Sequence, residues 1–338
     1  MYEIKKKRSF FVKKAVSLML SLVMIFVLLP SCGEKKEETP EPPVTVRLGA
    51  LKGPTTIGAV KLLNDSEENN NDNEYTFTMA ASANELLPQL MKDELDILAV
   101  PINLGSIAYQ NSKDVQLLAV NTLGVLYIVE KGGDSVKTLS DLRGKTVYAT
   151  GKGATPEYAL SYLLAENGLT LGEDVTVEWK SEPTEIVAQM ALEDSAVAML
   201  PQPFVTVAQT KLEGLRVALD LTQEWESLGG DSRFVTAGWF VRREFAEEHP
   251  EAIKTFLREY AESAEYVSQN ASEAAPLVEK YGIVKAPVAE KAIPHCGICC
   301  LTGDEMKTAV SGYLEVLYEQ NPKAVGGALP GDDFYYAS

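Results

Sequence analysis

The sequence predicts an α/β fold arranged as two lobes. From Val44 onward about 295 residues remain. Domains of this size seldom form around a single hydrophobic core, so two lobes are expected. Strand-like and helix-like segments alternate from there to residue 220, a pattern typical of parallel or mixed sheets flanked by helices. Beyond residue 241 this alternation gives way to helical periodicity alone.

The alternation occurs in two runs. The first run contains the strand-like segments VTVRLG, YTFTM, DILAVP and VQLLAV, separated by a helix from Pro54 and by SANELLPQLMKDE and NLGSIAYQ. The second run, after Gly144, consists of KTVYAT, PEYALSYLLAENG, DVTVEWK, PTEIVAQMALED, SAVAMLP, PFVTVAQTK and LRVALD. The C-terminal segments REFAEEHPEAIKTFLREYAESAEYVSQ, SEAAPLVEKYG and DEMKTAVSGYLEVLYEQ are expected to be helices that cover a sheet built earlier, with no further strand.

The N-terminus has the features of a secretion signal. Six basic residues at positions 5–14 precede an apolar segment, residues 15–29, which is shorter than the ~20 residues of a membrane-spanning helix. It runs into LPSCG, which resembles a bacterial lipobox. We therefore expect residues 1–31 to be a lipoprotein signal peptide, Cys32 to be lipidated, and residues 32–43, charged and proline-rich, to be a tether. The alternative is an uncleaved signal anchor. Under either interpretation, we expect the rest of the chain to lie outside the cytoplasmic membrane.

The charge of the exported part excludes nucleic acid as a partner. Residues 1–31 hold six of the 31 basic and one of the 48 acidic side chains, so the remainder has a net charge of −22. No cluster of lysine and arginine follows Cys32. Such a surface repels nucleic acids and anionic lipids.

Two glycine-containing loops are suited to holding a polar group. In YATGKGATP (148–156), two glycines bracket Lys152 and Pro156 stands where a helix starts. The amides of a first helical turn have no partners within the helix, so they are available to an anionic or strongly polar group. The spacing fits neither a P-loop nor a dinucleotide fingerprint. KGPTT (52–56) repeats the arrangement, and the alternative is that the glycines serve only the turns.

The cysteines leave three alternatives open. Besides Cys32, the chain has Cys296, Cys299 and Cys300, all in HCGICC. Structural zinc sites usually gather two separated pairs, and no second pair exists here. Buried thiols, a disulfide from Cys296 to Cys299 or Cys300, and a soft-metal site are the three interpretations, and we predict no metal and no cofactor. Since the motifs G-x-S-x-G and H-E-x-x-H are absent, we also predict no catalytic residue.

Three segments carry a resemblance to a known family. They are SDLRGKTVYATGKGATPEYALSYLLAENGL (140–169), AQMALEDSAVAMLPQPFV (188–205) and FVRREFAEEHPEAIKTFLREY (240–260). In order and spacing they resemble the substrate-binding lipoproteins of ABC importers, in the nitrate, sulfonate, taurine and thiamine-pyrimidine (NMT1/THI5-like) group. The resemblance implies a type II periplasmic-binding-protein fold, with two lobes of mixed sheet joined by a two-strand hinge near residues 122–126 and 235–238. Lobe 1 would then comprise residues 44–124 and 236–338, and lobe 2 residues 125–235.

The same resemblance implies a monomeric receptor, lipid-anchored at the outer face of the bacterial cell membrane, that passes a small solute to an ABC permease and ATPase. In open α/β sheets ligands bind outside the carboxyl ends of the strands. The loops there supply most of the predicted ligand-binding residues: Lys52, Gly53, Pro54, Thr55, Thr56, Ser82, Asn84, Pro101, Asn103, Gly151, Lys152, Gly153, Ala154, Thr155, Gln202 and Phe204. Trp239 is predicted to bind as well, because it could stack on a flat ligand as Phe204 could, and packing in the core or hinge is the alternative for both.

Two other functions remain open at this stage. HCGICC invites comparison with thiamine-pyrimidine synthases of the same fold, which carry a cysteine-rich iron motif, although the export signal and the C-terminal position of the cysteines argue against such an enzyme. A sensing lipoprotein that reports its bound state to a membrane partner is the other alternative.

Overall fold

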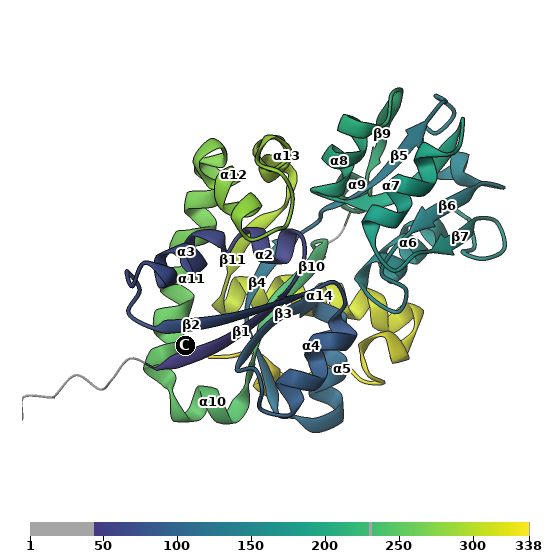
Figure 1. The fold of residues 1–338 in the computed structure, drawn as a ribbon. Helices are drawn as coiled ribbons and strands as arrows, with labels where there is room; N and C mark the ends of the chain where they lie inside the picture. Colours follow the sequence, from purple (N-terminus) through teal and green to yellow (C-terminus); the bar gives the residue numbers. More distant parts are fainter. Residues whose placement is uncertain (1–43, 230–231, 338) are drawn as a thin grey trace, which may run out of the picture. The chain divides into compact units, whose positions relative to one another are not determined.

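The computed structural model describes residues 44–229 and 232–337 (Figure 1). The predicted signal peptide, the lipidated Cys32 and the tether (residues 32–43) lie outside the described residues. In the described part, no helix combines the length and the apolar character needed to cross a membrane.

A mixed sheet of six strands has the order β11-β4-β10-β3-β1-β2. The strand β1 pairs in parallel with β2 and β3, whereas β10 runs antiparallel to β3 and β4, and β11 antiparallel to β4. The strand β3 is almost entirely buried, which explains its continuous apolar sequence. The bounds are β1 Thr45–Leu51, β2 Glu74–Ala80, β3 Ile97–Pro101, β4 Val115–Leu123, β10 Val235–Arg242 and β11 Ile298–Leu301.

A second mixed sheet has five strands in the order β7-β6-β8-β5-β9. Here β6 pairs in parallel with β7 and β8, and β5 runs antiparallel to β8 and β9. The bounds are β5 Leu126–Lys131, β6 Thr146–Ala149, β7 Thr176–Trp179, β8 Ala196–Pro201 and β9 Leu215–Asp220. The predicted α/β class with two mixed sheets is therefore confirmed.

The chain passes from the first sheet to the second between Leu123 and Leu126, and it returns to the first at Val235. Both positions fall in the segments where the hinge crossings were expected. Residues from Pro43 to Ser338 form one compact unit, so the assignment of residues 44–124, 125–235 and 236–338 to two lobes remains a prediction.

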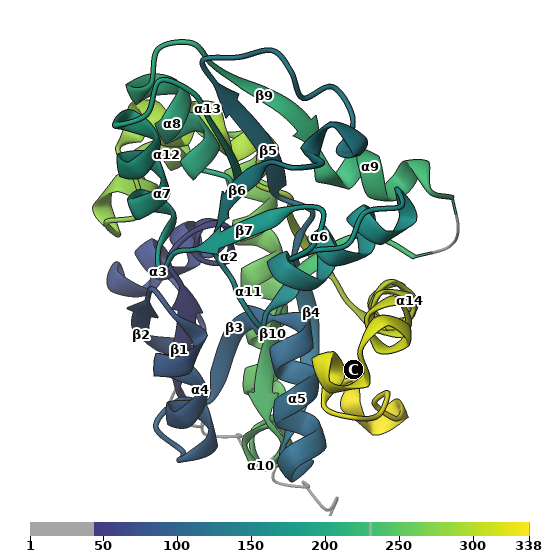
Figure 2. The ribbon, with the colours of Figure 1, turned by 90° about the vertical axis from the view of Figure 1, so that its right-hand side faces the viewer.

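Helices flank both sheets (Figures 1 and 2). Their starts follow local rules: Ser82 and Glu85 form a capping box at α4, and Pro250 occupies the first turn of α11. The bounds are α2 Pro54–Ile57, α3 Val60–Glu67, α4 Ala83–Met91, α5 Ile102–Ser112, α6 Thr155–Glu166, α7 Pro183–Ala191, α8 Phe204–Lys211, α9 Leu221–Ser227, α10 Arg243–Glu248, α11 Pro250–Gln269, α12 Ala271–Lys280, α13 Ala286–Ala292 and α14 Gly303–Gln320, with short 3₁₀ turns η1 Leu139–Leu142, η2 Ile293–His295, η3 Pro322–Val325 and η4 Asp332–Phe334.

The helix α11 shows how the first sheet is covered. Its buried residues Ile253, Phe256, Tyr260 and Ala264 recur every three or four positions, which places them on one face. That face packs on a core cluster that includes Trp239 of β10. Of the other C-terminal helices, α14 contacts β4 and β10 and also α6, while α13 contacts α8.

The strand β11 corrects the expectation that residues beyond 241 form no strand. It pairs with β4 at the edge of the first sheet. Its side chains alternate between two cores, since Cys299 packs on one cluster while Ile298 and Cys300 pack on another. This alternation is the normal pattern of a strand between two apolar layers, and four residues are too few for it to stand out in the sequence.

Candidate functional site

The predicted loops lie at one edge of each sheet. In the first sheet β1, β2 and β3 are parallel, so the loops that follow them emerge at their common carboxyl edge. In the second sheet β6 and β8 are parallel, and residues 150–156 and 201–204 follow them in the same way. This is the place where open α/β sheets bind ligands.

Asn103 connects these two edges. It lies in the first turn of α5, is fully buried, and donates from its side-chain amide to the carbonyl oxygens of Gly153 (3.3 Å) and Ala324 (3.2 Å). The hydroxyl of Thr155, also fully buried, lies 3.4 Å from Oδ1 of Asn103 and 3.3 Å from the carbonyl oxygen of Thr236. The structure thus brings Asn103, Gly153 and Thr155 into direct contact.

The glycines of the 151–155 loop are required by its backbone. Gly151 and Gly153 have φ angles of 85° and 76°, in the left-handed region that favours glycine. A Cβ on Gly151 would approach Pro156 to 2.6 Å, whereas one on Gly153 would meet nothing within 4 Å. The loop then enters α6 after Ala154, which provides no side-chain cap.

Two amides of this loop are already bonded within the protein. The N–H of Gly153 donates to the carboxylate of Glu157 at 2.5 Å, and the N–H of Ala154 donates to the carbonyl of Gly151 at 3.0 Å. Lys152 is exposed, and no described carboxylate lies within ion-pair distance of it. An anion at this helix start would therefore compete with Glu157.

The loop of residues 52–56 is also internally bonded. The hydroxyls of Thr55 and Thr56 donate to the carbonyl of Leu51 at 2.7 and 2.6 Å, and the N–H of Lys52 donates to that of Ala80 at 2.8 Å. Gly53 precedes α2, which starts at Pro54. Among the described residues, no hydrogen bond joins this loop to residues 151–155.

The remaining predicted residues serve mostly as caps or core. Ser82 accepts from the N–H of Asn84 at 3.2 Å, and Pro101 is the N-cap of α5. Phe204 is 5% exposed, and the fully buried Trp239 packs edge-on against Phe256 and Tyr260. Neither aromatic residue lines the cavity found at the edge of the second sheet.

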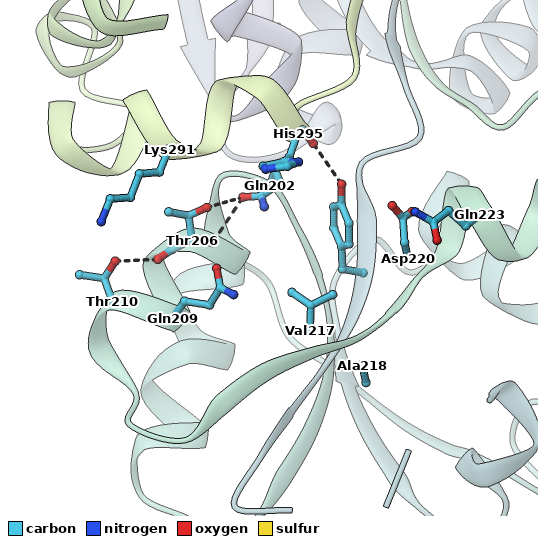
Figure 3. Close-up of a pocket in the computed structure, with 11 residues that line it drawn as sticks. Gln202, Thr206, Gln209, Thr210, Val217, Ala218, Asp220, Gln223, Lys291 and His295 are labelled. Carbon is cyan, nitrogen blue, oxygen red and sulfur yellow. Dashed lines mark hydrogen bonds between the residues drawn. The ribbon is translucent and has the colours of Figure 1, made fainter. Parts of the chain in front are cut away.

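This cavity has a volume of about 710 Å³ and lies between the carboxyl edge of the second sheet and the segment formed by α13 and η2 (Figure 3). Of the predicted residues it contains only Gln202. Nine of its eleven lining side chains can form hydrogen bonds, and four of these, those of Tyr127, Asp220, Lys291 and His295, are ionisable. The lining consists of Tyr127, Gln202, Thr206, Gln209, Thr210, Val217, Ala218, Asp220, Gln223, Lys291 and His295.

Gln202 is held rigidly at the start of α8. Its backbone N–H donates to the carbonyl of Val125 at 3.0 Å, and its Oε1 accepts from the N–H (3.3 Å) and hydroxyl (2.9 Å) of Thr206. The side chain is 4% exposed. Among the described residues, no acceptor pairs with the side-chain amide nitrogen of Gln202, so this nitrogen can donate to a bound molecule.

Tyr127 joins the second sheet to η2, since its hydroxyl donates to the carbonyl oxygen of His295 at 3.4 Å. Burial raises the pKa of Tyr127 to about 12, and the charge of Asp220 contributes to the rise. The phenol therefore stays protonated at neutral pH and acts as a donor. Asp220 itself caps α9 by accepting from the N–H of Thr222 at 2.9 Å.

Sequence reasoning missed most of this cavity. Asp220 ends the strand-like segment LRVALD, so the carboxyl-end rule could have found it. Lys291 and His295 come from the C-terminal helical part, and nothing in their local sequence indicates that they face the second sheet.

The three cysteines of HCGICC are free thiols. Cys296 packs in a cluster with α12 and α13, while Cys299 and Cys300 point to the two sides of β11. Burial raises the pKa of Cys299 to about 12 and that of Cys300 to about 11. Within residues 44–229 and 232–337, no group of three or more histidine, cysteine, aspartate or glutamate side chains could hold a metal ion.

Comparison with known proteins gives one family and a consistent fold. A family model described as "ABC transporter, phosphonate, periplasmic substrate-binding protein" matches residues 60–288. Comparison with curated proteins gives no match.

Similar solved structures include an ABC transporter protein from Parabacteroides distasonis (24% identity, TM-score 0.72, covering 87% of this chain and 99% of that one). The periplasmic aliphatic sulphonate binding protein SsuA from Escherichia coli is also similar (18% identity, TM-score 0.70, covering 88% of this chain and 93% of that one). A third similar structure is the alkanesulfonate-binding protein SsuA from Xanthomonas axonopodis pv. citri, bound to MOPS (16% identity, TM-score 0.66, covering 86% of this chain and 95% of that one). At these identities the similarity shows the fold alone.

Proposed function

Because the chain belongs to the family of periplasmic substrate-binding proteins of phosphonate ABC transporters, we propose that it captures a small polar or anionic solute and delivers it to an ABC permease driven by an ATPase. The protein would act as a monomeric, lipid-anchored receptor at the outer face of the cell membrane. Binding, release and docking are its tasks, and transport energy comes from its partner.

The observation that carries this proposal is the cavity at the carboxyl edge of the second sheet. Its lining contains hydrogen-bonding side chains from β5, β9, α8 and α9 and faces Lys291 and His295 of the C-terminal part. A cavity with several convergent polar groups, at the edge where α/β sheets bind ligands, is suited to holding a small solute reversibly.

The predicted loops have a second role in this proposal. Asn103 and Thr155 hold the edges of the two sheets together, so they would set the spacing between the two lobes when a solute is bound. Lys52 and Lys152, both exposed, would supply positive charge at the rim.

Solute binding is tested by melting. The chain from residue 32, with Cys32→Ser, is heated alone and with sulfonates, phosphonates, nitrate, pyrimidines and amino compounds. We expect at least one class to raise the melting temperature, because a ligand that binds only the folded state stabilises it. Gln202→Ala should reduce that rise, whereas Gln269→Ala, the same change on the exposed face of α11, should not. No shift with any class would contradict the proposed function.

Lipid anchoring is tested separately. In cells fed a labelled fatty acid, the wild-type chain should carry the label and fractionate with the membrane, while Cys32→Ala should lose the label. A labelled Cys32→Ala variant would refute attachment at this residue.

An enzymatic function is not favoured by any feature of the site. The matched family consists of transport binding proteins. Of the cysteines that prompted the comparison with pyrimidine synthases, Cys296 is buried in one cluster, and the partly buried Cys299 and Cys300 pack against two others. A sensing role would use the same cavity and differ only in the membrane partner.

A further inference from the structure

The cavity contains two opposite charges, neither of which has an ionic partner in the described part of the chain. Lys291 lies in the last turn of α13, and Asp220 is the N-cap of α9. No carboxylate lies within 4.0 Å of Lys291 and no cationic group within 4.0 Å of Asp220 among the described residues. Figure 3 shows the two side chains on opposite sides of His295.

The side of the cavity near Lys291 presents neutral groups. Lys291 extends from α13 toward α8 (Figure 3), where the hydroxyl of Thr206 donates to Gln202 and that of Thr210 donates to the carbonyl of Thr206 at 2.8 Å. No carboxylate of the described residues lies within ion-pair distance of the ammonium group there. A bound solute would therefore gain most by placing an anionic or strongly accepting group at this side.

The side near Asp220 has the opposite preference. One carboxylate oxygen of Asp220 accepts from the N–H of Thr222, and no described side chain donates to the other. Glu224 lies nearby, and burial followed by the charge of Asp220 raises its pKa. Two carboxyl groups with no cation between them favour a cationic or donating group on the solute.

The sum of these charges argues against a dianion. With histidine counted as neutral, the lining carries one positive and one negative charge, and the exported chain has a net charge of −22. A group with two negative charges would find a single ammonium partner, and the carboxylate of Asp220 in the same cavity would repel it.

We infer that the solute of this cavity is dipolar with no net charge, with its anionic group toward Lys291 and its cationic group toward Asp220. This inference rests on the proposed function and departs from a simple phosphonate, which carries up to two negative charges. Apart from Val217 and Ala218, the remaining lining side chains can form hydrogen bonds, so they would serve the polar groups between the two ends.

Calorimetry on the mature Cys32→Ser chain at pH 8 tests this charge preference. The probes are ω-amino carboxylates of two to six carbons, with the matching carboxylates, amines and dicarboxylates, and alkylphosphonates of the same lengths. For the chain length that binds best, we expect the ω-amino carboxylate to bind at least about tenfold more tightly than each of its counterparts.

Two variants test whether Asp220 and Lys291 cause this charge preference. Asp220→Asn, which keeps a capping side chain, should abolish the advantage of the amino carboxylate over the plain carboxylate. Lys291→Gln should abolish the tighter binding of the amino carboxylate relative to the amine. Asp134→Asn and Lys254→Gln make the same changes at exposed positions and should alter neither ratio.

The outcomes separate the inference from the proposed function. Binding of an alkylphosphonate or dicarboxylate as tight as that of the amino carboxylate would overturn the inference while supporting the receptor function. If no probe of this set binds, the inference falls. The proposed function falls with it only when the wider melting panel also shows no shift.

Discussion

Asn103 and Thr155 join the carboxyl edges of the two sheets through side chains that are both fully buried, with 3.4 Å between Oδ1 and the hydroxyl oxygen. The same asparagine donates to carbonyl oxygens of the loop before α6 and of η3. One side chain therefore links α5, the start of α6 and the C-terminal segment.

Replacing Asn103 should destabilise the fold. Asn103→Ala leaves the buried carbonyl oxygen of Ala324 without this donor, which costs about 1–3 kcal/mol, and it also removes the part-buried hydrogen bond to Gly153. We expect the free energy of unfolding to fall by about 2–4 kcal/mol in urea denaturation. Asn111→Ala, on the exposed face of the same helix, should change it by less than about 0.5 kcal/mol. Equal effects of the two changes would contradict the role of Asn103.

Glu130 should make the second sheet sensitive to acid. Burial alone would raise its pKa, but hydrogen bonds from the side chain and N–H of Ser135, from the N–H of Val136 and from Arg216 outweigh burial and lower the pKa to about 2. The folded state thus keeps this charge to lower pH than the unfolded state, whose pKa is near 4.5. The stabilisation is complete above pH 4.5 and is lost as the pH falls toward 2.

The size of this effect is on the order of 3 kcal/mol. Denaturation curves between pH 7 and pH 3 should show a steeper loss of stability for the wild type than for Glu130→Gln, which has no charge to lose. The exposed substitution Glu213→Gln should behave as the wild type. Parallel pH profiles for Glu130→Gln and the wild type would show that the carboxylate has no such role.

The three thiols should react only after unfolding. Burial raises the pKa of Cys299 and Cys300 to about 12 and 11 and that of Cys296 well above its ordinary value. At pH 8 the thiolate fraction is then at least about 100-fold below that of a free cysteine. Mass spectrometry of the Cys32→Ser chain after alkylation should find little label when folded and three labels when unfolded. Fewer than three labels in the unfolded chain would reveal a disulfide.

The parts of the fold that sequence could predict depend on local patterns. Strands such as ILAVP and AVAMLP are short apolar runs between turn signals, and their alternation with helices determines the α/β class. Ser82 with Glu85 is a capping pattern readable from four residues. The strand β11 escaped prediction because its pairing with β4, nearly 180 residues earlier, decides its structure.

The candidate site likewise contains residues that local sequence could predict and residues that only tertiary packing brings there. The loops at the strand ends were predictable because the chain direction places them at one edge, as Asn103 and Thr155 show. Lys291 and His295 were not, since only tertiary packing of α13 against α8 brings them to the cavity. Glu157 was within reach, because it lies four residues after Gly153 on the first turn of α6, where a carboxylate is favoured near free amides.

The last prediction concerns the two glycines of the 151–155 loop. Both have positive φ angles, so alanine at either position costs about 1 kcal/mol of backbone strain. At Gly151 the added Cβ would also meet Pro156 at 2.6 Å. We therefore expect Gly151→Ala to lower the melting temperature more than Gly153→Ala. Gly144→Ala is the control for strain alone, since its φ of 74° matches that of Gly153 and its Cβ would be equally unobstructed.

Solute binding then distinguishes a binding loop from a plain turn. If the amides around Gly153 face the bound solute, Gly153→Val should weaken binding, because a β-branched side chain would occupy the space next to them, and each lost hydrogen bond costs about 0.5–1.5 kcal/mol. Thr155→Ala should weaken binding less, by about one hydroxyl contact. Gly144→Val should leave the affinity unchanged at a similar cost in stability. Equal affinities for the wild type, Gly144→Val and Gly153→Val in calorimetry would mean that the glycines serve only the turn and the contact with Asn103.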